Sequence, residues 1–131
     1  AIALNGEVVQ EIPNLVVTAG KNWVASRMKD TTKAAMTHMA IGTNNTTAAV
    51  GQTSLSAEVA RGALTSTTVS NNTIAYVETF AAGTGTGAII EAGVFNASSS
   101  GDMLCRTVFA SGVVNKGSAD SMTITWTITV S

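Results

Sequence analysis

Residues 121–131 read SMTITWTITVS, in which apolar side chains alternate with threonines. Alternation of this length predicts a β-strand, because successive side chains of a strand point to opposite faces of its sheet. One face is apolar and is expected to lie in the core: Met122, Ile124, Trp126, Ile128 and Val130. The other, the threonine face, consists of Thr123, Thr125, Thr127 and Thr129. It faces either water or a neighbouring subunit, and we take it as a candidate contact face.

Short apolar segments recur through the rest of the chain at roughly ten-residue spacing, separated by Gly, Asn and Ser. Residues 64–69 and 73–80 are expected to pair as a hairpin around Asn71 and Asn72, because asparagine tolerates the positive φ of tight turns. The pattern predicts a mainly β fold, either an antiparallel β-sandwich or a jelly-roll or barrel-like domain.

One segment, about residues 18–29, has helical spacing instead of alternation. Thr18 is the expected N-cap of this helix, and Trp23 is expected to anchor it on the sheet. Its buried stripe is expected to contain Ala19, Trp23, Val24, Arg27 and Met28. The fold therefore has one short N-terminal helix in addition to its strands.

The 131 residues are enough for one domain, with a strand and helix expected in residues 1–35 and the β-sandwich in 36–131. Only 11% of the residues are charged, against about 25% in ordinary proteins. No apolar run approaches the roughly 18 residues of a membrane span. The net charge of -1 argues against nucleic-acid binding, which needs a basic patch. Such a surface suits packing against copies of the same chain or a larger assembly; the alternative is a β-protein kept soluble by hydroxyl groups.

Residue types that usually perform chemistry are scarce. His38 is the only histidine, and Cys105 is the only cysteine and lies in an apolar strand, where a buried unreactive thiol is expected. The glycine-rich residues 81–87 lack the lysine of a phosphate-binding loop. We expect no metal, no cofactor and no small-molecule substrate.

Two acidic residues, Glu78 and Glu91, fall inside expected strands. Facing carboxylates can perform acid–base catalysis. The preferred interpretation is that each pairs with Arg61 or Arg106, within the sheet or at a subunit boundary. We therefore expect no enzymatic activity.

A polar loop is expected over residues 43–56, longer than most connections, and long loops are often binding elements. Val50 and Leu55 are expected to attach it to the core. Its candidate contact residues are Asn44, Asn45, Thr46 and Thr47.

Several segments resemble small virion structural proteins of tailed bacteriophages, the head-decoration and tail-fibre-like proteins. They are residues 38–43 (HMAIGT), 58–64 (EVARGAL), 80–89 (FAAGTGTGAI), 91–96 (EAGVFN), 106–109 (RTVF) and 123–128 (TITWTI), with residues 14–21 (NLVVTAGK) leading into them. The resemblance covers nearly the whole chain and brings no catalytic residues with it.

This resemblance implies a structural protein of the virion. With the size, the low charge and the hydroxyl-rich surface, it favours a capsid decoration (cement) protein that bridges capsid subunits. The expected partners are other copies of the chain, preferably as a trimer, and the major capsid protein. The opening AIALNG lacks the pattern of a signal peptide, so synthesis in the host cytoplasm and residence in the virion are expected. The alternatives are a tail-fibre or baseplate component, and a receptor- or glycan-binding module, which would need exposed aromatic side chains.

Overall fold

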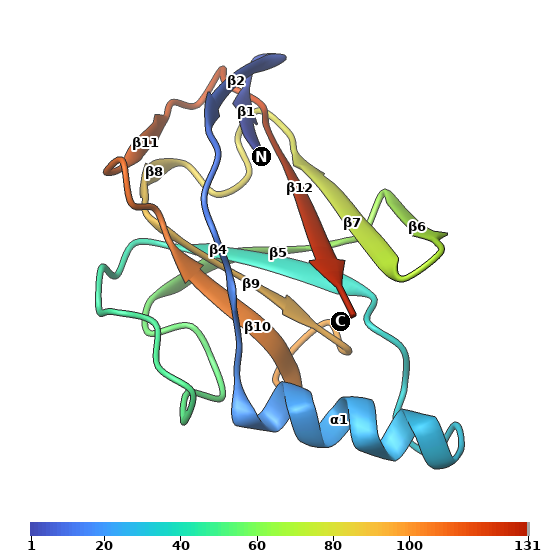
Figure 1. Ribbon diagram of the computed structural model, residues 1–131. Coiled ribbons are helices and arrows are strands. Elements are labelled where there is room, and N and C mark those ends of the chain that lie inside the picture. The colour runs from blue at the N-terminus through green and yellow to red at the C-terminus, as the bar shows by residue number, and fades with distance from the viewer. Residues whose placement is uncertain (131) are drawn as a thin grey trace.

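The computed structural model describes residues 1–130, which form two five-stranded antiparallel sheets packed together, with a helix across one end (Figure 1). Sheet A contains, in order, β2 (Glu7–Gln10), β1 (Ile2–Leu4), β12 (Met122–Thr129), β7 (Thr73–Phe80) and β6 (Ser66–Ser70). Sheet B contains, in order, β3 (Leu15–Val16), β10 (Met103–Val108), β9 (Glu91–Phe95), β4 (His38–Gly42) and β5 (Glu58–Ala63). A small sheet joins β8 (Gly87–Ile89) to β11 (Val114–Lys116). The predicted antiparallel β-sandwich with one helix is confirmed.

The closing strand β12 is the middle strand of sheet A and pairs with β1 on one side and β7 on the other. Its apolar side chains Met122, Ile124 and Trp126 are buried in the main core between the sheets, as predicted. Ile128 is only partly buried, and Val130 is 70% exposed. The prediction of Val130 as a core residue is therefore wrong: it follows the end of β12 at Thr129, and its backbone bonds to Asn72 in the turn of the β6–β7 hairpin.

The hairpin of β6 and β7 has the predicted two-residue turn, and Asn71 has the positive φ of 53°. Its first strand differs from the prediction, since residues 64–69 do not form one strand. The chain instead runs along sheet B as β5, turns at Leu64 and Thr65, and continues in sheet A as β6. This change of sheet was not predicted.

The register of β10 against β9 shifts between Met103 and Cys105, which indicates a bulge at Leu104. Alternation alone places Leu104 on the same side as Arg106. The bulge instead places Leu104 beside Cys105 in the main core, while Met103 joins a second cluster on the outer side of sheet B.

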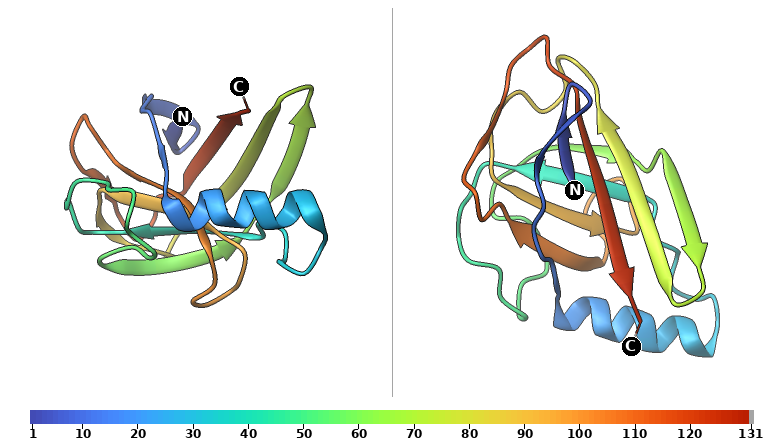
Figure 2. Two further views of the ribbon diagram at one scale, coloured as in Figure 1. Left: turned by 60° about the horizontal axis from the view of Figure 1, so that its bottom comes forward. Right: turned by 45° about the horizontal axis from the view of Figure 1, so that its top comes forward.

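The helix α1 spans Thr18–Lys29, as predicted. Its N-cap is Val17 and not Thr18, which is already helical and donates its backbone N–H to Val50 O at 2.7 Å. Gly20 is its only buried residue, because the helix contacts β10 there (Figure 2).

The predicted apolar stripe of this helix is only partly buried. Trp23 does pack against the main core and donates its Nε1–H to Ala34 O at 2.8 Å. Val24 and Met28 are exposed, Met28 by 84%, so their prediction as buried residues is wrong. The helix crosses the end of the sandwich and therefore covers the sheets with one narrow line of contact only (Figure 1).

Candidate contact surfaces

The threonine face belongs to the outer face of sheet A, on the side away from sheet B. Residues directly opposite in neighbouring strands share a face, so the register of sheet A gives the composition of this surface. On β1, β12, β7 and β6 it contains Thr123, Thr125, Thr127 and Thr129 of β12, Thr73, Ala75, Val77 and Thr79 of β7, Ser66, Thr68 and Ser70 of β6, and Ala3 of β1. We call these twelve residues the outer face. None of them is charged.

The outer face is accessible along its whole length. Thr127 and Thr129 are exposed, while Thr123 and Thr125, which lie closer to β1, are half-buried. Thr79 and Thr123 share a hydrogen bond of 2.9 Å between their hydroxyl oxygens. The face is therefore a flat array of small side chains, in which most hydroxyl groups remain available to a partner.

The loop with the candidate residues Asn44, Asn45, Thr46 and Thr47 lies over the outer side of sheet B and is held by a buried ion pair. Glu91 Oε1 lies 3.0 Å from Arg106 Nη2, and both side chains are fully buried. Glu91 Oε2 also accepts the backbone N–H of Asn44, and Arg106 Nη1 donates to Thr46 O at 2.8 Å. The expected pairing of Glu91 with Arg106 is confirmed.

The same ion pair also fixes the far end of this loop. Glu91 accepts the backbone N–H groups of Ser56 and Ala57 at 3.1 and 2.9 Å. Gly42, opposite Glu91 in the neighbouring strand, leaves room for the carboxylate, since a Cβ there would lie 2.5 Å from Glu91 Oε2. Both ends of the loop are thus hydrogen-bonded to one buried carboxylate, while Asn45, Thr46 and Thr47 remain exposed and Asn44 is half-buried.

The loop is attached to the core by Leu55, which is buried in the second cluster, as predicted. The side chain of Val50 is 50% exposed, so the prediction that it also attaches the loop is wrong. The attachment comes instead from the backbone of Val50, whose carbonyl accepts the N–H of Thr18. A backbone contact of this kind leaves no signal in the sequence.

The two candidate surfaces lie on opposite layers of the sandwich. The outer face belongs to sheet A, whereas Glu91, Arg106 and the loop that they hold lie on the outer side of sheet B. Figure 1 shows this loop on the far side of sheet B from β12 and β7. One flat partner cannot contact both surfaces of one chain at once.

The other carboxylate inside a strand, Glu78, has no arginine partner in the described part of the chain. It accepts hydrogen bonds from Thr65 Oγ1 at 2.9 Å and from the backbone of Thr79. Its expected pairing with an arginine within the sheet is therefore wrong. Arg61 pairs with Glu58 at 2.7 Å and lies over the ring of Phe95, at 3.8 Å from the ring centre.

The residues considered for chemistry lie apart from one another. Cys105 is fully buried, and burial raises the pKa of its thiol, so the thiolate is disfavoured. His38 shares a hydrogen bond with the neighbouring Thr37 hydroxyl. The glycine-rich segment is held by a residue that was not singled out in the sequence: the buried Lys116 donates to Ala81 O at 2.8 Å.

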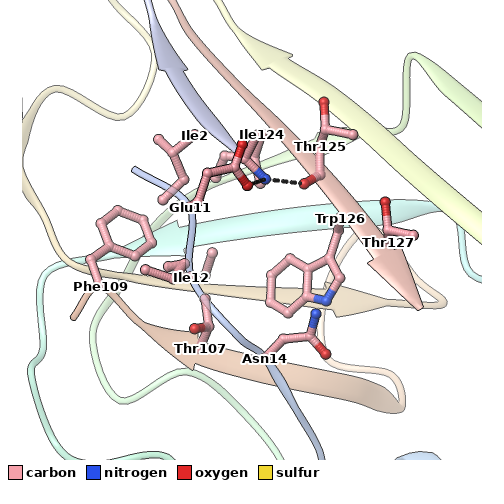
Figure 3. A pocket seen from close by; sticks show the side chains of 12 residues that line it. Ile2, Glu11, Ile12, Asn14, Thr107, Phe109, Ile124, Thr125, Trp126 and Thr127 are labelled. Carbon is pink, nitrogen blue, oxygen red and sulfur yellow. Dashed lines mark hydrogen bonds and ion pairs between the residues drawn. The ribbon is translucent and has the colours of Figure 1, made fainter. Parts of the chain in front are cut away.

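A cavity of about 160 Å³ opens between the sheets beside β1 (Figure 3). Ile2, Ile12 and Phe109 contribute apolar walls, and Glu11 is the one acidic side chain of its lining. Trp126 contributes a buried indole N–H that has no hydrogen-bond partner among residues 1–130. Asn14 and Thr107 add an amide and a hydroxyl group to this lining, so the walls are partly polar, and Glu11 has no second acid among the lining residues with which to form an acid–base pair.

Within residues 1–130, no three His, Cys, Asp or Glu side chains are grouped as metal ligands. No helix of this part of the chain has the length and hydropathy of a membrane-spanning segment.

Comparison with known proteins gave no relatives. No protein-family model, no curated protein and no solved structure matches the chain.

Proposed function

We propose that this protein is a structural component of a tailed-bacteriophage virion, a capsid decoration protein that bridges subunits of the head shell and has no enzymatic activity. The observation that supports it best is the uncharged outer face of sheet A, twelve residues across β1, β12, β7 and β6. The proposed partners are further copies of the chain and the major capsid protein.

The free-energy cost of burying a face of this composition against a partner is low. Burying a charged side chain requires a paired charge, whereas a buried threonine or serine hydroxyl costs less hydration free energy and can replace its lost water by a hydrogen bond to a partner's backbone. Small β-branched side chains also lose little conformational freedom on contact, because their rotamers are already restricted in a strand. The outer face therefore suits a broad polar interface.

The size of the face favours self-association. Four strands at about 4.8 Å spacing, with about six residues each at 3.3 Å, give a flat area of about 400 Å². A standard interface covers about 800 Å² per partner, so one copy alone makes a weak contact. An oligomer, with a trimer preferred for threefold positions of a shell, presents several such faces together and gains affinity through multivalency.

The direct test of the proposal is binding to heads. The purified protein is expected to bind empty expanded heads and to raise their melting temperature in calorimetry, because a ligand that binds only the assembled shell stabilises it by mass action. Binding to purified tails with no effect on heads would contradict the decoration function and support the alternative of a fibre or baseplate component.

Replacing Thr127 by lysine tests the contact surface separately from folding. Thr127 is exposed in the middle of the outer face, so T127K is expected to change the free energy of unfolding by less than about 0.5 kcal/mol. Head binding is expected to fall at least tenfold, because an unpaired ammonium would be buried in the contact. S118K, at an exposed turn outside this face, is the matched control. Equal binding by T127K and S118K would show that the outer face contacts water only.

A receptor- or glycan-binding module receives little support from the aromatic residues. Five of the six are buried, and the sixth, Trp23, is half-buried with its indole N–H bonded to Ala34. A glycan-binding surface of the usual kind needs a ring that is free to stack on a sugar.

A further inference from the structure

Strand β6 forms one edge of sheet A and is unprotected against pairing with another strand. All five of its residues, Ser66–Ser70, are exposed. It contains no charged residue and no proline, and its register against β7 has no shift from Ser66 to Ser70. Exposed edge strands normally contain a charged residue, a proline or a register shift, because a free edge offers unpaired N–H and C=O groups to any other strand.

The other three edges of the two five-stranded sheets have such protection. Edge strand β2 begins with Glu7, and its pairing with β1 has a register shift. Edge strand β3 has only two residues and follows Pro13. Edge strand β5 contains Glu58 and Arg61, and its pairing with β4 is also shifted. β6 is the exception among the four.

The backbone groups that β6 presents can be assigned from the hydrogen bonds of its neighbours. In an antiparallel sheet, the N–H and C=O of one residue point to the same side, and successive residues alternate. Thr125 bonds to Ala1, on the β1 side, so the next residue, Trp126, bonds to β7. Tyr76, the partner of Trp126, therefore bonds to β12 and not to β6.

The residue of β6 opposite Tyr76 is Thr67. Its N–H and C=O consequently point away from the sheet, and by alternation so do those of Val69. Ser66, Thr68 and Ser70 use their backbone groups toward β7. The free edge thus offers two donors and two acceptors, on Thr67 and Val69.

We propose that β6 pairs with the β6 strand of a second copy of this chain, antiparallel and around a two-fold axis at Thr68. This register places Thr67 opposite Val69 of the partner subunit at both ends, and each such pair exchanges two hydrogen bonds. Thr68 then lies opposite Thr68 of the partner subunit, and threonine–threonine pairs across strands are favourable. The two five-stranded sheets become one sheet of ten strands.

A second copy is the occupant that the strand fits best. Two identical strands can lie side by side only where no like charges meet, and β6 has none. The other edges are protected, so the pairing stops at two copies instead of continuing into a filament. The pairing leaves the outer face open and joins two such faces, about 800 Å² together by the estimate above. It does not depend on the proposed virion function, and it gives a dimer in place of the trimer preferred there.

The proposal is tested with the isolated chain by sedimentation equilibrium and by amide hydrogen exchange. A monomer–dimer equilibrium is expected between about 1 µM and 1 mM, the range of weak and moderate association. The amides of Thr67 and Val69 are expected to gain protection as the concentration rises, while that of Thr68 is protected at all concentrations. A monomer throughout this range, or a dimer with unprotected Thr67 and Val69 amides, would overturn the proposal.

T68K provides the matched variant, because the two-fold axis would place the two lysines against each other. It is expected to weaken the dimer at least tenfold while circular dichroism remains unchanged, since Thr68 is exposed. S118K adds the same charge away from the edge and is expected to dimerise like the wild type. Equal dimerisation of T68K and S118K would place the contact elsewhere on the chain.

Discussion

Replacing Arg106 by methionine is expected to lower the free energy of unfolding by about 3–5 kcal/mol, the usual cost of removing one partner from a buried ion pair. Arg106 and Glu91 are both fully inaccessible, and methionine keeps most of the volume of the arginine stem. The variant leaves a buried carboxylate without its cation. It also removes the donor to Thr46 O and to the side chain of Gln52, so the loop of residues 43–56 loses part of its support.

Urea unfolding measures this loss, and two further variants define its origin. K33M removes the cation of the exposed pair between Lys33 and Asp102, 3.3 Å apart, and is expected to cost less than about 1 kcal/mol. The double variant E91Q/R106M has neither charge of this ion pair and is expected to be more stable than R106M alone. If the double variant were no more stable, the loss would come from packing and not from the unpaired carboxylate.

The strands and the helix were predictable where one local pattern dominates. The alternation in residues 122–129 identifies β12 and its buried face, and helical spacing identifies α1 with its observed bounds. Charge indicated that Glu91 pairs with an arginine, which it does, but the same reasoning failed for Glu78, which accepts hydrogen bonds from Thr65 and Thr79 instead. The pattern fails for three side chains that are exposed, Val24 and Met28 of the helix and Val130 after the strand.

What was not predictable depends on contacts between distant segments. The bulge at Leu104 has no signal in the sequence and reverses the face of that residue. Strands β1 and β11 have three residues each and form only because β12 and β8 provide their partners. The length of the candidate contact loop suggested that it binds a partner. Its support by Glu91 could not be predicted, because the fold brings this carboxylate to three backbone N–H groups that are distant from it in the sequence.

The position of helix α1 depends on one glycine. A Cβ on Gly20 would overlap the backbone carbonyl of Leu104, and it would also lie within 2.8 Å of Leu104 Cα. Both atoms belong to the main chain of β10, so no side-chain rotation can relieve the overlap. The bulge at Leu104 occurs at this contact, which makes the helix and the irregular part of the strand depend on each other.

Replacing Gly20 by alanine is therefore expected to lower the free energy of unfolding by about 1–3 kcal/mol, the range for overpacking, although alanine favours the helix itself by about 1 kcal/mol. Asn22 is exposed on the same helix, and N22A is expected to be neutral or stabilising by a few tenths of a kcal/mol. The two variants share the helix propensity of alanine and differ in the contact with β10. Thermal unfolding of G20A and N22A thus compares the effect of packing against β10 with the effect of helix propensity. Equal or higher stability of G20A would mean that α1 does not lie on β10 at Leu104, and the end of the sandwich that it covers would then be open to a partner.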